Sequence, residues 1–160
     1  MADCVEVSLG TKCWTGKTLR FAGGCHCGAI RVELETSRRP EDQILGACQC
    51  SFCRKHNARA FSDPSARLSI TTSQYDALHL YEFGLCTSKQ VICNRCGVYV
   101  AMILIDDEEV LSVLNIDALN ERARFTQEAR PRVYDNESKA ERIQRRRQQW
   151  IPTTLVGWLN

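Results

Sequence analysis

The chain has 160 residues, the size of one ordinary domain, and its 44% hydrophobic and 25% charged residues are typical of a globular protein. A net charge of +2 is too small for a strong overall electrostatic attraction to nucleic acid or to anionic membranes. No apolar run reaches the roughly 18 residues of a transmembrane helix, and residues 1–6 (MADCVE) are unlike a signal peptide. We therefore expect a cytoplasmic protein with neither a nucleic-acid nor a membrane partner.

Residues 1–18 show no period and are predicted to be an irregular or edge-strand lead-in. Alternating or short apolar runs then predict strands over residues 29–35, 43–47, 67–71, 77–83, 89–92, 98–105 and 109–114. A helical turn or short helix is expected over 54–60. Many short strands with little helix predict a mainly β fold.

The C-terminal part of the sequence has a different character. Helix formers without glycine or proline predict a basic helix over residues 138–149, which contains Arg142, Arg145, Arg146 and Arg147. Such a helix can dock an acidic partner, although a solvated charged face is the commoner explanation. Residues 153–160 are apolar enough to pack on the body of the protein or to reach another subunit as a homo-oligomer. We therefore divide the chain into residues 1–18, 19–130 and 131–160.

Ten cysteines are the most informative residues of the chain. In a reducing compartment, clustered cysteines are metal ligands more often than disulfides, and neighbours in a Cys-x-Cys motif rarely bridge to each other. A disulfide framework is the alternative. Seven of the ten form three clusters, at Cys25 and Cys27, at Cys48, Cys50 and Cys53, and at Cys93 and Cys96. Outside the clusters lie Cys4, Cys13 and Cys86, of which Cys4 and Cys13 are expected to be small hydrophobes or exposed thiols.

The first and last clusters can form one site. Cys25 and Cys27 lie about 65 residues before Cys93 and Cys96, and each pair follows a predicted strand and precedes a glycine. Adjacent hairpin ends can then close a cage of four thiolates, which is a filled tetrahedron for zinc. A saturated site of this kind would stabilise the fold.

The central cluster supplies only three thiolates, from Cys48, Cys50 and Cys53. One position of a zinc tetrahedron is left for water or a substrate atom, as in catalytic zinc sites. Zinc held by three thiolates prefers a further thiolate and lowers the pKa of that thiol, so thiol chemistry is indicated. Alternatively, a fourth protein ligand fills the position; the candidates are Cys86, His26, His56 and His79.

Other polar residues near the central cluster are candidates for auxiliary roles. His56 lies three residues after Cys53 and can act as a general acid or base, or orient the substrate. Arg54 and Lys55 can bind the carboxylates of an anionic thiol, or be solvated charges. His79 lies in an apolar strand and is expected to be structural.

The sequence resembles the glutathione-dependent formaldehyde-activating enzyme (GFA) family, which shares its domain with the centromere protein CENP-V. The matching segments cover roughly residues 20–120 and are GGCHCG at 23–28, CQCSFCRK at 48–55, YEFG at 81–84 and CNRCGV at 93–98. The resemblance implies a zinc-bound fold of the β-tent type, built from short antiparallel strands. It also implies two zinc ions, a structural one on the four cysteines of the outer clusters and a catalytic one on the central three.

The function that the resemblance implies is a zinc-dependent carbon–sulfur lyase. Its partner would be a small thiol or thiol adduct, such as one of glutathione with an aldehyde. Two alternatives stay open from the residues alone: a non-enzymatic zinc module that binds a partner, and an enzyme that uses zinc-bound water on a small biosynthetic intermediate.

Overall fold

A computed structural model of the chain describes residues 17–107 and 109–158. The strands span Leu19–Gly24 (β1), Ile30–Thr36 (β2), Gly46–Cys48 (β3), Ala60–Phe61 (β4), Arg67–Thr72 (β5), Leu78–Tyr81 (β6), Lys89–Cys93 (β7), Tyr99–Asp106 (β8), Glu109–Asn115 (β9), Arg130–Arg132 (β10) and Ile151–Val156 (β11). The α-helices span Ser51–Lys55 (α1) and Lys139–Gln149 (α2). The predicted mainly β fold with a C-terminal helix is therefore confirmed. Nearly all of the predicted lead-in, with Cys4 and Cys13, lies outside the described residues.

Short 3-10 turns connect several of these elements, at Pro40–Asp42, Tyr75–Ala77, Ile116–Ala118 and Arg122–Arg124. None of the helices in the described part of the chain is both long and apolar enough to cross a membrane.

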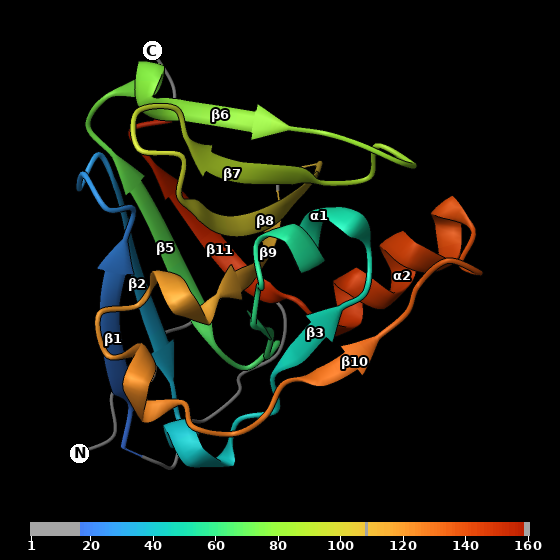
Figure 1. Cartoon of the computed structure of the whole chain (residues 1–160), viewed down its shortest axis with the longest axis horizontal. Coiled ribbons are helices and arrows are strands. Elements are labelled where there is room, and N and C mark those ends of the chain that lie inside the picture. Colours follow the sequence, from blue (N-terminus) through green and yellow to red (C-terminus); the bar gives the residue numbers. More distant parts are fainter. Residues whose placement is uncertain (1–16, 108, 159–160) are drawn as a thin grey trace.

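Two groups of strands share one continuous network of pairing (Figure 1). One group is β1-β2-β5-β11, and the other contains β6-β7-β8-β9. Strand β9 pairs with β8 along one edge, and with β11 and β4 along the other. Strand β11 starts beside β9 at Ile151 and continues beside β5 from Thr153, so it joins the two groups.

Apolar side chains of both groups meet in one main core. In β2, Ile30, Val32 and Leu34 are buried while the residues between them face outward, as the alternating sequence requires. Phe21 of β1 packs edge-on against Phe125, with ring centroids 5.4 Å apart. This core buries one face of the β1-β2-β5 layer and fixes the loops at its ends.

Most strand pairs are antiparallel, as expected, but β3–β10 and β5–β11 are parallel. Both parallel pairs join strands that are far apart in the sequence, and parallel neighbours need such long connections. Strand β10, which the sequence pattern did not predict, brings residues 130–135 alongside the central cysteine cluster.

The C-terminal segment is part of the fold. After β11, the indole N–H of buried Trp158 donates a hydrogen bond to the carbonyl of Ile70 at 3.0 Å. Gly157, which lies between the end of β11 and Trp158, has φ +75°, and a Cβ at this position would overlap the carbonyl oxygen of Thr72. Glycine is therefore required where the tail turns across β5.

Helix α1 differs from the sequence-based prediction. It begins at Ser51, inside the central cysteine cluster, and ends at Lys55, whereas a turn or helix was expected over 54–60. Cys50 is the N-cap, and its sulfur accepts a hydrogen bond from the backbone N–H of Cys53. Asn57, with φ 47°, stops the helix. A thiol in an N-cap role is not among the usual capping signals, and for this reason the start was missed.

Candidate metal centres and adjoining cavity

The four cysteines of the outer clusters come together in space. The sulfurs of Cys25, Cys27, Cys93 and Cys96 all lie within 4.8 Å of one another, and we call them the four-sulfur cluster. Cys27 Sγ is 3.6 Å from Cys25 Sγ and 3.5 Å from Cys93 Sγ. These separations exceed a disulfide bond by far, and they are close to the edge of about 3.8 Å in a tetrahedron with Zn–S bonds of about 2.3 Å. The donor set therefore fits one tetrahedral metal ion.

Two similar turns present these sulfurs. In the first, the Gly28 N–H donates to the Cys25 carbonyl, and Gly28 has φ +78°. In the second, the Gly97 N–H donates to the Cys93 carbonyl, and Gly97 has φ +73°. In each turn, a glycine in the left-handed conformation lets the backbone reverse direction directly after the cysteines. The sequence pattern of cysteines followed by glycine thus encodes both turns.

The surroundings of the four-sulfur cluster affect its thiols unequally. Burial raises the pKa of the Cys93 thiol to about 12. Burial also opposes ionisation of Cys96, but hydrogen bonds with the backbone at Val98 and Cys27 outweigh it and lower the pKa of that thiol to about 6. Four neighbouring thiols do not ionise together without a cation. A bound metal ion would supply the positive charge that allows it.

The central cluster has three sulfurs, which also lie within 4.8 Å of one another; we call it the three-sulfur cluster. Cys48 is the last residue of β3, Cys50 caps α1, and Cys53 lies in the first turn of that helix. Three sulfurs within six residues are therefore brought together by the end of a strand, the cap of a helix and the first turn of that helix. Cys53 is buried, while Cys48 and Cys50 are partly exposed.

A shared hydrogen bond couples two thiols of the three-sulfur cluster. It lowers the pKa of Cys48 to about 6 and raises that of Cys53, which burial raises further. Beside them, burial first and then the neighbouring sulfurs raise the pKa of the Tyr99 phenol well above its usual value. Tyr99 therefore stays neutral next to a cluster that carries negative charge.

The described residues, 17–107 and 109–158, provide no fourth cysteine, histidine or carboxylate ligand atom within 4.8 Å of all three sulfurs. Cys86 lies on an exposed turn, with its sulfur 3.7 Å from the Gly84 carbonyl. His26 and His79 are exposed, and the His79 ring stacks beside Tyr81.

His56, the C-cap residue that follows α1, is exposed to solvent, and its ring lies against Phe52 and Tyr99 at centroid distances of 4.4 and 5.3 Å. It lies outside the wall of the cavity described next, as do exposed Arg54 and Lys55.

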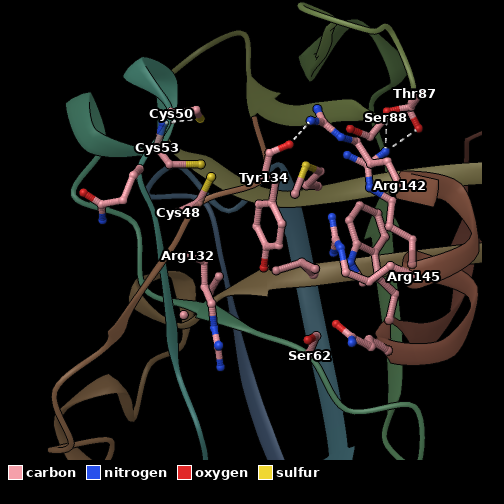
Figure 2. A pocket seen from close by; sticks show the side chains of 18 of the residues that line it. Cys48, Cys50, Cys53, Ser62, Thr87, Ser88, Arg132, Tyr134, Arg142 and Arg145 are labelled. Carbon is pink, nitrogen blue, oxygen red and sulfur yellow. Dashed lines mark hydrogen bonds between the residues drawn. The ribbon is translucent and has the colours of Figure 1, made fainter. Parts of the chain in front are cut away.

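A cavity of about 340 Å³ opens from the three-sulfur cluster. Met102, Val113 and Trp150 give it apolar surface, and Tyr134 lies between the sulfurs and helix α2 (Figure 2). A volume of this size accommodates a small organic molecule or a short peptide. Ligand space and sulfur donors are thus in direct contact.

Arginines line the cavity on two sides. Arg142, Arg145 and Arg146 come from α2, across the cavity from the sulfurs, whereas Arg132 comes from β10 and pairs with Cys48 beside them. The sequence predicts this basic helix, with a solvated charged face or an acidic partner as the two explanations of its charge. Residues three and four apart share one helix face, so the spacing of 142, 145 and 146 was the available signal. What the spacing could not indicate is that this face borders the same cavity as the cysteines.

The fold and these sites define a class: mainly β proteins with two cysteine clusters that can hold metal ions, one of them opening into a ligand-sized cavity. Within this class, the chain belongs to the glutathione-dependent formaldehyde-activating enzyme (GFA) family, whose model matches residues 20–136. A crystal structure of a Rhodobacter sphaeroides protein is similar, with 31% sequence identity and a TM-score of 0.54. That similarity covers 69% of this chain and 99% of the other.

Proposed function

We propose that the protein is a zinc-dependent carbon–sulfur lyase that makes or breaks the C–S bond of a thiol adduct of an aldehyde or a related small molecule. The proposal rests on one observation, that the two clusters differ in their number of sulfurs. Four sulfurs surround one point, whereas three sulfurs face a cavity. Membership of a family named for glutathione-dependent formaldehyde activation supports the same chemistry.

Each cluster has its own proposed role. The four-sulfur cluster would hold a structural zinc that ties the turn after β1 to the turn after β7. Cys48, Cys50 and Cys53 would hold the second ion, and zinc bound there supplies stabilisation of a substrate thiolate. The wall of the cavity would orient the rest of the thiol.

The proposed reaction balances without a further reactant. In the joining direction, the thiol sulfur bonds to the carbonyl carbon and the carbonyl oxygen takes up the proton that the thiol has lost. In the reverse direction, the electron pair of the C–S bond returns to sulfur and the hydroxyl proton leaves as the aldehyde forms. A bound water is proposed to exchange this proton, with His56, which lies outside the cavity wall, as the side chain that could act through it.

The substitution Cys50→Ser tests this proposal. Serine is a preferred N-cap, so α1 keeps its capping hydrogen bond while the cluster loses a soft donor. We expect turnover of glutathione and formaldehyde, followed by NMR exchange, to fall to the uncatalysed rate while the circular dichroism spectrum is unchanged. Cys86→Ser, at an exposed turn outside the cavity, is the matched control and keeps its activity. Full turnover by Cys50→Ser contradicts the proposal.

A further inference from the structure

The wall of the cavity formed by α2 contains more positive charge than its acidic neighbour neutralises. Glu137 binds Arg145 through two hydrogen bonds, with Nε 2.6 Å from Oε1 and Nη2 2.9 Å from Oε2. Such a two-point pair occupies both oxygens of the carboxylate. The two remaining cavity arginines of α2, Arg142 and Arg146, must therefore rely largely on other partners.

Arg146 has only neutral partners in the described structure. Its side chain is 5% exposed, and Nη1 donates to the carbonyl and the hydroxyl of Thr87 at 2.8 and 2.6 Å. Its Cζ lies over the Trp150 ring, 4.6 Å from the ring centroid. Its Nε is buried and has no hydrogen-bond partner, and none of the ion pairs among the described residues includes it.

Arg142 is in a similar position. Its Nη2 donates to the Tyr134 carbonyl. Its Nε lies 3.5 Å from Glu137 Oε2, but the geometry is not that of a hydrogen bond and this buried Nε has no other partner among the described residues. Nη1 of Arg142 and Nη2 of Arg146 make no hydrogen bond among the described residues, so two neighbouring guanidinium groups line one cavity with donors left over.

This arrangement is unfavourable without an anion. Burial lowers the pKa of Arg146 to about 10, and the charges of Arg145 and Arg142 add to the effect. A buried charge is normally paired, because removal from water costs far more than neutral hydrogen bonds return. A carboxylate matches the planar fork of guanidinium donors and would neutralise the excess.

We propose that Arg142 and Arg146 form a carboxylate subsite that selects thiols carrying a carboxylate at a distance from the sulfur. This inference rests on the proposed function, since it identifies the substrate class of the same cavity. Figure 2 shows the spatial basis: Cys48 and Cys53 lie on one side of Tyr134, and Arg142 and Arg145 lie on the other. A ligand that spans the cavity places its sulfur and its carboxylate at these two walls.

The subsite belongs to a segment beyond the region that matches the family model. That match ends at residue 136, and α2 begins at Lys139. Helix α2 begins there with a capping box between Ser138 and Glu141. The C-terminal segment of this chain would therefore determine which thiols the cavity accepts.

Isothermal titration of the zinc-loaded protein with S-methylglutathione and with its dimethyl ester tests the subsite. Both probes lack a thiol, so binding does not depend on C–S chemistry. We expect the wild type to bind the acid at least about tenfold more tightly than the ester, since a hydrogen-bonded charge pair is lost with the ester. Arg142→Gln should reduce this preference to less than about threefold.

Two further variants make the test specific. Arg147→Gln changes an arginine of the same helix that pairs with Asp106 outside the cavity, and it should keep the wild-type preference. Glu137→Gln frees Arg145 and should bind the acid more tightly than the wild type does. Circular dichroism confirms that each variant is folded.

The outcomes separate the subsite from the reaction. Equal binding of acid and ester by the wild type, equal losses in Arg142→Gln and Arg147→Gln, or no binding of either probe at millimolar concentration would overturn the subsite. A preference for the acid that depends on Arg142, found in a protein without C–S turnover, upholds the subsite and refutes the proposed reaction. Turnover without any preference for the acid upholds the proposed reaction and refutes the subsite.

Discussion

Replacing Cys93 by serine should destabilise the whole domain, whereas replacing Cys50 should not. Cys93 is 1% exposed in the main core, and its sulfur lies 3.5 Å from that of Cys27, 66 residues earlier in the chain. The four-sulfur cluster therefore connects two distant turns. Thiolate zinc sites of this kind contribute about 10–16 kcal/mol in small peptides, comparable with the total stability of about 5–15 kcal/mol of a domain.

Loss of one of the four ligands should lower the free energy of unfolding by more than about 4 kcal/mol, a size that is typical of losing a metal site. Urea denaturation of the zinc-loaded proteins, followed by far-ultraviolet circular dichroism, measures the change. Cys50→Ser should lose clearly less unfolding free energy than Cys93→Ser, because the three-sulfur cluster lies within six residues and joins no distant segments, and serine keeps the N-cap hydrogen bond. A wild-type urea midpoint for Cys93→Ser, or a Cys50→Ser protein as unstable as Cys93→Ser, would show that the four-sulfur cluster has no special role in stability.

Two other predictions concern the C-terminal segment. Because the hydrogen bond from Arg145 lowers the pKa of the Glu137 carboxyl, its stabilisation is fully present above the ordinary value of 4.5 and is lost as the pH falls through the lowered value. Between about pH 6 and about pH 3 the wild type should therefore lose more unfolding free energy than Glu137→Gln, and parallel losses would refute the pairing. Gly157→Ala should lower the free energy of unfolding by about 1–3 kcal/mol, since φ is +75° and the new Cβ would overlap the Thr72 carbonyl; an unchanged thermal midpoint would contradict this.

The cysteine clusters could be predicted from the sequence because their geometry is mostly local. Cys48, Cys50 and Cys53 lie within six residues, and a strand end followed by a helix cap is enough to bring their sulfurs together. The glycines after Cys27 and Cys96 likewise encode their turns within a few residues. Pairing of the two distant turns required only that β1 and β7 end on the same side of the molecule.

The cavity could not be predicted in the same way, because its walls come from long-range packing. Strand β10 contributes Arg132 through a parallel pairing with β3, more than 80 residues earlier. Helix α2 contributes Arg146 because that side chain reaches the Thr87 carbonyl, 59 residues away in the sequence. No local pattern records either contact. Charge alone therefore favours a solvated helix, and the sequence indicates Arg54 and Lys55, which are exposed, as the candidate carboxylate contacts.

X-ray absorption at the zinc edge, on the protein loaded with two zinc ions per chain, counts the sulfur neighbours of the metal. The two cysteine clusters should surround one ion with four protein sulfurs and the other with three. We therefore expect a mean of about 3.5 sulfur neighbours per zinc, with a light-atom ligand that a small thiol replaces. A mean of four sulfurs before any thiol is added would contradict it, because a protein side chain would then occupy the position reserved for the substrate.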